Sequence, residues 1–424
     1  MTEGNDWFKQ GLEHIWLPYA QMKTLPDPSA VRSTDGSTLI MEDGRQLIDG
    51  VGSWWTSVHG YNHPSLLKAA HQQLDQMPHV MLGGLAHQQA YRLAARLAQL
   101  TPGSLSKVFF TESGSVAVEV AMKVAVQYAM NRTGERRTRF VSFKGGYHGD
   151  TFATMSVCDP EEGMHSLFAG VVPEQYVVEI PDTEEREAAL EQVLESHDDI
   201  AGIIIEPLIQ GAGGMRMHSP DVLKTIRQLA DKHGVLLIFD EIFTGFGRTG
   251  EMFAANRAGV TPDILCLGKA LTGGVTPLAA TIATREVYAA FHTDSAGDAL
   301  MHGPTFTGHA VGCAVANAGL DLFEQEPRLE QVRAMEQQLL DELGPLNDHP
   351  DVVDVRVCGS VGAVEMAIDF DIEAARRWFI NRGTFIRPLG RVIYLTPSYV
   401  ISAEALGQLT TAIADFAGSL RTEG

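Results

Sequence analysis

Two side chains near the ends of predicted strands are the residues most informative about chemistry. Asp240 follows the apolar run 235–239, and Lys269 follows the apolar run 264–267. Ligands of open α/β sheets bind at the carboxyl ends of the strands, so both side chains are expected in one site. A lysine removed from water has a lowered pKa and can form a Schiff base with a carbonyl group. The pair therefore indicates amine–carbonyl chemistry beside an acid.

Two more segments could complete a cofactor site. Residues 111–116 (TESGSV) follow the predicted strand 107–111 and open a helix, where Gly114 and Ser115 could bind a phosphate, although a plain serine N-cap is the alternative. Tyr147, in the sequence GGYHGD after the strand 139–143, could stack on a planar ring or be an ordinary loop tyrosine. Phosphate loop, ring stacker, ring-nitrogen acid and lysine together are the equipment of a pyridoxal 5'-phosphate (PLP) enzyme.

Other interpretations of this region are weaker. A nucleotide hydrolase would need the loop G-x-x-x-x-G-K-[ST], which the sequence lacks. Residues 245–250 (GFGRTG) formally match the dinucleotide fingerprint, but they come late in the chain and lack a clear strand-end acid about 20 residues on. No H-E-x-x-H motif or cluster of His and Cys is present, so we predict no metal site.

The elements that must position these residues alternate between strands and helices. Continuous apolar runs at 107–111, 139–143, 201–205, 235–239 and 264–267 indicate strands buried on both faces, as in parallel sheets. A helix between two of them begins after Ser219 as N-cap, with Pro220 in its first turn, and stops at Gly234. We predict an α/β fold whose large domain has a mainly parallel central sheet.

The two ends of the chain differ from this middle part. Residues 1–60 are rich in loops, with a short strand at 38–41, and long helices dominate from about residue 311. Strands are expected at 363–369 and 392–396, and a last helix, capped by Ser402, carries one apolar stripe. We therefore expect three parts: residues 1–60 contribute to a small domain and the active site, 61–310 form the large cofactor-binding domain, and 311–424 form a smaller α+β domain.

Composition excludes several classes of protein. The 424 residues carry a net charge of −21, so binding to nucleic acid or to an anionic membrane surface is not expected as the main task. No apolar stretch approaches the roughly 20 residues of a membrane span, and residues 1–6 do not resemble a signal peptide. Four scattered cysteines indicate buried thiols in a reducing compartment, so we expect a cytoplasmic protein.

With these motifs in view, the sequence resembles the class III (ω-type) aminotransferases, which are PLP enzymes of fold type I. The resemblance runs from about residue 14 to residue 415. It rests on motifs shared by the family: Glu206-Pro207, Asp240-Glu241, TGFGRTG at 244–250, GKA at 268–270 and GPTF at 303–306. More specific stretches are HIWLPY at 14–19, GSWW at 52–55, SGSVAVE at 113–119, MHGPTF at 301–306 and IRP at 386–388.

The resemblance implies a role for each matching position. Lys269 forms the Schiff base with PLP, and Asp240 pairs with the pyridine nitrogen. Gly114 and Ser115 bind the phosphate, and Tyr147 flanks the ring and the substrate. The remaining residues are expected around the phosphate of the neighbouring subunit and in the substrate site: Pro304 and Thr305 for the phosphate, with Tyr19, Trp54, Trp55, Gly303 and Arg387 for the substrate. The protein should accordingly be a homodimer whose active site is shared across the interface.

The specific stretches are similar to those of family members that act in biotin biosynthesis. They imply S-adenosylmethionine as amino donor and 8-amino-7-oxononanoate as acceptor, giving 7,8-diaminononanoate. Arg387 could bind the acceptor carboxylate. Trp54 and Trp55 are expected on a strand, and their adjacent indole rings could offer apolar faces to the acceptor chain. Two alternatives stay open: lysine as donor to the same acceptor, and an ω-amino acid or polyamine aminotransferase that uses pyruvate or 2-oxoglutarate.

Overall fold

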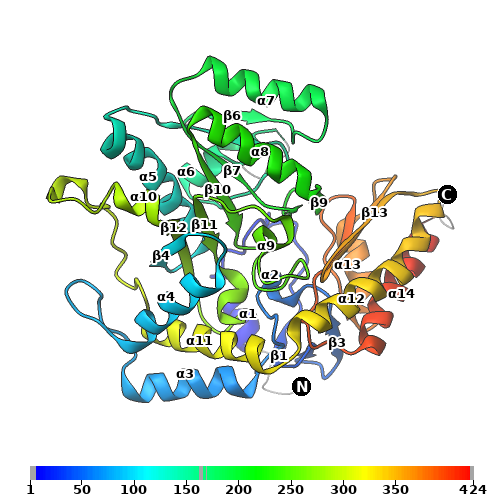
Figure 1. The fold of residues 1–424 in the computed structure, drawn as a ribbon. Helices are drawn as coiled ribbons and strands as arrows, with labels where there is room; N and C mark the ends of the chain where they lie inside the picture. The colour runs from blue at the N-terminus through cyan, green and yellow to red at the C-terminus, as the bar shows by residue number, and fades with distance from the viewer. Residues whose placement is uncertain (1–5, 162–165, 169, 421–424) are drawn as a thin grey trace.

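A seven-stranded sheet forms the centre of the computed structural model, which describes residues 6–161, 166–168 and 170–420 (Figure 1). The strands lie in the order β4-β12-β11-β10-β7-β5-β6. Their bounds are β4 Leu105–Thr111, β5 Arg139–Phe143, β6 Tyr176–Val178, β7 Ile200–Ile205, β10 Leu236–Glu241, β11 Ile264–Leu267 and β12 Ala279–Thr284. The five strands predicted from the sequence all belong to this sheet, and β10 extends far enough to include Asp240.

The sheet is mainly parallel, as expected, with one exception. Strands β6, β5, β7, β10 and β11 pair in parallel, whereas β12 runs antiparallel to both β11 and β4. The link from β11 to β12 contains only the short 3₁₀ turn η3 (Lys269–Thr272), with no crossover helix. Such a short link returns the chain antiparallel, because parallel neighbours need a longer crossover.

Helices cover both faces of this sheet (Figure 1). One face packs against α5 (Gly114–Thr133), whose side chains share an apolar cluster with β7, β10 and β11. The other helices of this part are α3 Pro64–Gln76, α4 Gln88–Leu100, α6 Phe152–Ser156, α7 Glu184–Ser196, α8 Pro220–His233, α9 Ala254–Ala258, α10 Arg285–Ala289 and α11 Ala310–Gln325. Helix α8 ends at Gly234 as predicted, but the Ser219 side chain makes no capping hydrogen bond.

Two small sheets are built from the ends of the chain. The first combines β1 (Val31–Asp35), β2 (Thr38–Met41) and β3 (Gln46–Asp49) with β15 (Thr384–Phe385), so segments far apart in sequence share a sheet. The second contains β13 (Val352–Cys358), β14 (Val361–Met366) and β16 (Val392–Leu395). It adjoins α12 Arg328–Leu343, α13 Ile372–Ile380 and α14 Ala403–Ser419, and Ser402 caps α14 as predicted.

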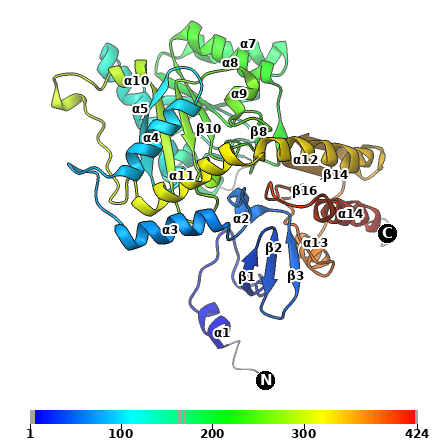
Figure 2. The same ribbon diagram turned by 60° about the horizontal axis from the view of Figure 1, so that its bottom comes forward.

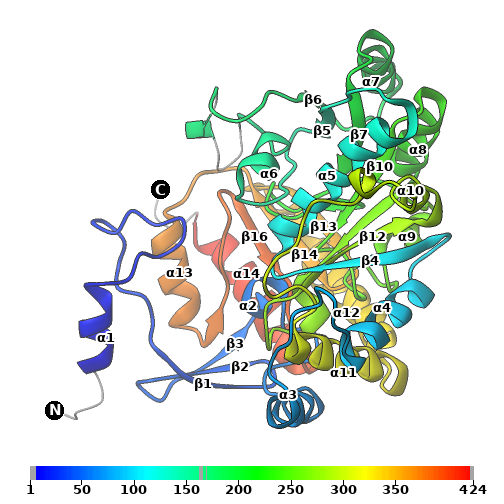
Figure 3. The same cartoon turned by 90° about the vertical axis from the view of Figure 1, so that its left-hand side faces the viewer.

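The N-terminal helix α1 (Asp6–Leu12) stands away from the rest of the chain, beside the sheet β1–β3 (Figures 2 and 3). The boundaries at residues 60 and 310 stay a prediction about domains. Short elements complete the chain: β8 Ile209–Gln210, β9 Arg216–Met217, η2 Ser166–Phe168, η4 Ala296–Asp298 and η5 Gly344–Asp348. Among the described residues, none of the helices combines the length and apolar character that a membrane span requires.

One local expectation was wrong. The segment that carries Trp54 and Trp55 is not a strand but the short turn α2 (Gly52–Trp55), in which Ser53, Trp54 and Trp55 have φ values of 48°, 51° and 75°. The left-handed backbone is held from outside: Arg248 donates to the carbonyl of Trp55 at 2.5 Å. The turn nevertheless places the two indole rings in different surroundings, because Trp55 is buried while Trp54 is 42% exposed.

Candidate active site

A cavity of about 180 Å³ lies at the carboxyl end of the central sheet. It collects side chains from β10, from η3, from the start of α5 and from the loop 145–150. Its lining residues are Ser113, Gly114, Ser115, Tyr147, His148, Gly149, Glu206, Asp240, Ile242, Phe243 and Lys269. Sequence reasoning placed five of these, namely Gly114, Ser115, Tyr147, Asp240 and Lys269, in one site, and the structure brings all five together.

Asp240 is held by two partners at the end of β10. Its Oδ2 atom lies 2.8 Å from His148 Nδ1, and its Oδ1 atom accepts a hydrogen bond from the Ile242 amide at 3.1 Å. Both side chains are almost completely buried. The imidazole therefore fixes the orientation of the carboxylate that faces the cavity. Sequence reasoning missed His148 because no local pattern shows that it faces a residue 92 positions away.

Lys269 presents its amine to the cavity from a strained position. Its φ of 42° lies in the left-handed region, which a lysine seldom adopts and which is often found at functional sites. The Nζ atom lies 4.3 Å from the centroid of the Trp55 ring and 5.8 Å from that of Phe243. Burial lowers the pKa of Lys269 to about 8, and the negative charges of Asp240 and Glu206 oppose that shift.

The N-terminus of α5 faces the loop 145–150 across a close contact. Ser113 caps the helix by accepting from the Val116 amide, which leaves the Gly114 and Ser115 amides at the cavity. Ser115 Oγ accepts a hydrogen bond from the Asp150 amide at 3.2 Å. A Cβ atom at Gly149, where φ is 128°, would lie 2.3 Å from Ser115 Oγ, so this approach requires glycine.

A triad of oxygen atoms lies at one side of the cavity. Asp150 Oδ1 accepts hydrogen bonds from the hydroxyls of Tyr19 at 2.5 Å and Tyr147 at 2.9 Å. Burial raises the pKa of Tyr19 to about 12 and also raises the pKa of Tyr147, and the adjoining Asp150 carboxylate adds to both shifts. Both phenols therefore stay protonated and act as donors. Sequence reasoning missed Asp150, although its position three residues after Tyr147 in a candidate loop was a usable signal.

Glu206 is another residue that sequence reasoning left without a role. The side chain lies at the end of β7, is buried and lines the cavity. Its two carboxyl oxygens accept hydrogen bonds from the amides of Tyr147 and Gly211, both at 2.9 Å. Burial raises the pKa of Glu206 to about 7, and the charge of Asp240 adds to the shift while that of His148 opposes it. This carboxyl group ties the tyrosine loop to the sheet.

Three of the predicted substrate residues form the outer part of the site. Tyr19 and Trp54 are 54% and 42% exposed, and the Arg387 guanidinium lies 4.7 Å above the Trp54 ring. Partial burial lowers the pKa of Arg387, which remains a cation. Trp55 points inward instead, toward Lys269. An anion at this rim would therefore meet one cation and an aromatic face.

The segment with Gly303, Pro304 and Thr305 is not brought to the cavity of its own chain. None of these three residues lines it, and Gly303 and Thr305 are exposed. The segment lies beyond β4, where Thr307 donates to the carbonyl of Phe110 at 2.7 Å. This position agrees with the expectation that the segment serves a neighbouring subunit, and that role stays a prediction.

The residues present fit a phosphorylated pyridine aldehyde. The helix N-terminus offers amides for a phosphate, the Asp240 carboxylate is aimed into the cavity, and the Lys269 amine is buried beside it with a lowered pKa. The dinucleotide hypothesis has no such support, because the glycine-rich residues 245–250 are all buried and offer no face to a pyrophosphate.

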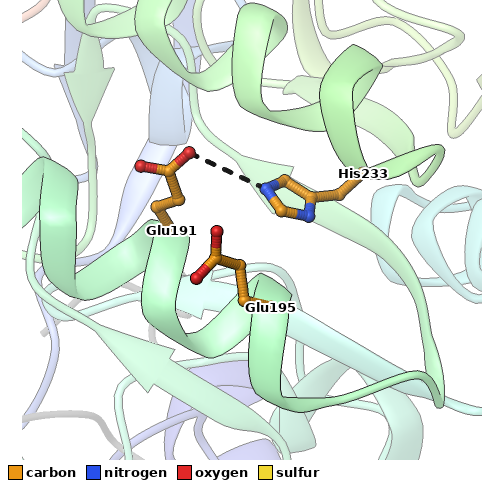
Figure 4. A group of neighbouring side chains, drawn as sticks. All are labelled: Glu191, Glu195 and His233. Carbon is orange, nitrogen blue, oxygen red and sulfur yellow. Dashed lines mark ion pairs between the residues drawn. The ribbon is translucent and has the colours of Figure 1, made fainter.

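A separate group of possible metal ligands lies on α7 and at the end of α8 (Figure 4). Glu191, Glu195 and His233 place one ligand atom each within 4.8 Å of the others. None of the three lines the cavity, and the Lys232 ammonium already pairs with Glu191. We therefore assign this group no part in the candidate active site.

Comparisons with known proteins agree with this geometry. A family model described as Aminotransferase class-III matches residues 19–416. Adenosylmethionine-8-amino-7-oxononanoate aminotransferase from Corynebacterium glutamicum is 44% identical over 410 residues, covering 95% of this chain and 96% of that protein.

Two solved structures share the fold. Adenosylmethionine-8-amino-7-oxononanoate aminotransferase from Methanocaldococcus jannaschii is 33% identical, with a TM-score of 0.91 over 97% of this chain and 99% of its own. An amine transaminase from an uncultivated Pseudomonas species, in its PLP-bound form, is 32% identical, with a TM-score of 0.87 over 95% of this chain and 97% of its own.

Proposed function

Because the chain belongs to the class III aminotransferase family, we propose that it transfers an amino group from S-adenosylmethionine to 8-amino-7-oxononanoate in biotin biosynthesis. The product would be 7,8-diaminononanoate. The observation that carries the proposal is that Lys269, Asp240 and Tyr147 line one cavity at the end of the parallel sheet. The identity to relatives named for this reaction, over nearly the whole of both chains, supports the choice of substrates.

Pyridoxal 5'-phosphate is the cofactor that this site would hold. When bound, it supplies a ring that takes up the electrons released as an amine substrate loses its Cα proton. Lys269 would hold its aldehyde and Asp240 its ring nitrogen, while Tyr147 would cover the ring. The amides of Gly114 and Ser115 would bind the phosphate at the positive end of α5.

Lys269 is the base that the cavity offers to the substrate carbon. Its lowered pKa leaves a useful fraction of the amine neutral near pH 8, so it can take up a proton and return it. Asp240, oriented by His148, presents its carboxyl group to the same cavity. Glu206 holds the Tyr147 loop in place through its bond to the Tyr147 amide.

The rim residues would select the substrates. Arg387 would bind the acceptor carboxylate while Trp54 packs against the acceptor chain, and Trp55 would bound the inner end. Tyr19 and Tyr147 place the Asp150 carboxylate beside the cavity, where a cationic amine donor could meet it. Gly303 would reach the substrate from a partner subunit.

A homodimer is the assembly we propose, with Pro304 and Thr305 contacting the phosphate of the neighbouring subunit. An exposed apolar patch supports it, which comprises Met81, Leu85, Met301 and Phe306, each 49% to 75% exposed. The two loops of this patch pack on each other, since the Phe306 and His79 rings lie 4.7 Å apart. Large exposed apolar groups of this kind mark protein–protein contacts.

The cytoplasm is the compartment we propose. All four cysteines, Cys158, Cys266, Cys313 and Cys358, are buried as free thiols. Free thiols are typical of a reducing compartment.

The decisive experiment follows the absorbance of the bound cofactor while one amine is added at a time. We expect S-adenosylmethionine to change the spectrum, and subsequent addition of 8-amino-7-oxononanoate to restore it. Lysine, alanine and 1-phenylethylamine are the competing donors, and Lys269→Ala is the control for uncatalysed change.

Other results of this experiment would point to other functions. A response to lysine alone would indicate a different donor for the same acceptor. Conversion by 1-phenylethylamine, with no restoration by 8-amino-7-oxononanoate, would favour an amine transaminase, the class of the Pseudomonas structure.

A further inference from the structure

Phe243 and Trp55 form an aromatic wall directly behind the reactive lysine. Their ring centroids lie 4.3 Å apart at an interplanar angle of 48°, and the Lys269 amine lies within 6 Å of both rings. Phe243 lines the cavity, and both side chains are buried. The sequence had already indicated that Phe243, which lies between Asp240 and Gly245, could alter the shape of the pocket.

The wall is fixed from behind. A Cβ atom at Gly211 would lie 2.9 Å from the Phe243 ring, so backbone closes that side without a gap. The buried Arg248 guanidinium lies 5.6 Å from the ring centroid of Phe243 and donates to the carbonyl of Trp55. A ring held on both sides has little room to move away from a substrate.

The predicted rim of the site, unlike the wall, is exposed to solvent. Tyr19 and Trp54 are both more than 40% exposed, and Arg387 lies above Trp54. A long substrate chain that leaves the reacting carbon can extend along this rim. A group on the side of the reacting carbon that faces Phe243 meets the wall.

The proposed substrates share a matching asymmetry. Both carry one long chain at the reacting carbon, and both carry one short group: a carboxylate in S-adenosylmethionine and an aminoethyl group in 8-amino-7-oxononanoate. We propose that Phe243, backed by Trp55, is a specificity-determining residue that limits this second group to a short one. The inference rests on the proposed function and names the feature of the site that excludes bulkier substrates.

Two ketones test the wall, since they differ only in the short group. These are 7-oxononanoate, with an ethyl group beyond the ketone, and 8-phenyl-7-oxooctanoate, with a benzyl group. Neither carries an amine, so calorimetry on the holoenzyme measures binding without turnover. We expect the natural protein to bind the ethyl ketone at least about tenfold more tightly. Phe243→Ala should bring the two affinities to within about twofold, and Phe243→Leu should give an intermediate ratio.

Phe253→Leu is the matched control, because Phe253 is equally buried but does not line the cavity. It should leave the ratio unchanged, and thermal melting of each variant reports folding. If Phe243→Ala unfolds, the ratio of the two ketone affinities in Phe243→Leu tests the role of Phe243 instead. If the ratio of the two ketone affinities is unchanged in a folded Phe243 variant, the specificity role of Phe243 is overturned. Equal affinities for the two ketones in the natural protein overturn it as well. Neither result affects the proposed function. Failure of the natural protein to bind either ketone overturns the proposed acceptor and, with it, this inference.

Discussion

Lys269 combines two properties that single residues seldom share, a strained backbone and a buried amine. The aromatic rings of Trp55 and Phe243 surround the amine, and the carboxyl groups nearby are themselves held by hydrogen bonds to His148 and to backbone amides. The side chain is thus kept from water without being locked into a salt bridge that would suppress its nucleophilicity. The chemistry of the site follows from this balance.

The first prediction concerns the pH dependence of cofactor uptake. Only the neutral amine can attack an aldehyde, so raising the pH promotes attachment as Lys269 loses its proton. With its pKa near 8, about half of the amine is neutral at pH 8, against less than about 1% for an ordinary lysine. We expect the rate of PLP uptake by the apoprotein to rise with pH and level off above pH 8 to 9.

Absorbance measures the rate of PLP uptake, and circular dichroism over the same pH range excludes unfolding. A rate that still rises beyond pH 10 would contradict the lowered pKa of Lys269.

The second prediction concerns Asp240. In Asp240→Asn the amide cannot stabilise a positive ring nitrogen, so kcat should fall by about a hundredfold or more while PLP still binds. Steady-state kinetics and the cofactor content of the purified variant give the two quantities. Asp240→Glu, which keeps the charge, should lose less activity. A near-normal kcat for the asparagine variant would show that another group manages the ring nitrogen.

At the scale of elements, β10 serves two purposes with consecutive residues. Because successive side chains of a strand point to opposite faces, Asp240 reaches the cavity while Glu241 turns toward α9. The Glu241 carboxylate accepts hydrogen bonds from the amides of Ala254 at 2.7 Å and Ala255 at 2.8 Å. It thereby caps α9, whose own N-cap residue, Phe253, offers no acceptor side chain.

The third prediction tests this cap. Glu241→Ala leaves two buried amides without acceptors, which should lower the free energy of unfolding by about 2 kcal/mol or more. Urea denaturation of the holoenzyme measures the loss. Glu241→Gln keeps one acceptor oxygen and should lose less. Equal stability of the alanine variant and the natural protein would mean that water or a rearranged backbone replaces the cap.

At the scale of the whole molecule, two residues that are predicted to bind the cofactor phosphate lie outside the cavity of their own chain. Pro304 and Thr305 lie on the exposed segment beside the apolar patch of Met81, Leu85, Met301 and Phe306. A second copy packed on this patch would cover it and bring those residues to a neighbouring site. Assembly and activity should therefore be linked.

The fourth prediction follows from that link. Phe306→Glu places a charge in the patch, so it should weaken the dimer and lower specific activity increasingly on dilution. Analytical ultracentrifugation and dilution assays measure the two effects. Leu340→Glu is the control, because Leu340 is comparably exposed but lies on α12. Activity that persists in a fully monomeric Phe306→Glu protein would exclude a shared site.

The sequence alone determined the local chemistry and the sheet. Apolar runs bounded by helix signals predicted five strands of the central sheet, and strand ends predicted where Asp240, Lys269, Tyr147 and Ser115 would gather. These features are local or periodic, so the order of residues along the chain specifies them. Motif resemblance indicated the family, which the comparisons then confirmed.

Tertiary structure decided what depends on contacts between distant segments. Three contacts of the site join residues between 92 and 188 positions apart. They are the pairing of His148 with Asp240, the hydrogen bond from Tyr19 to Asp150, and the ring contact of Trp55 with Phe243. The left-handed turn at Trp54 and Trp55 is another example, because a guanidinium from residue 248 holds it. No local propensity encodes such contacts, since each forms only after the sheet has brought its strand ends together.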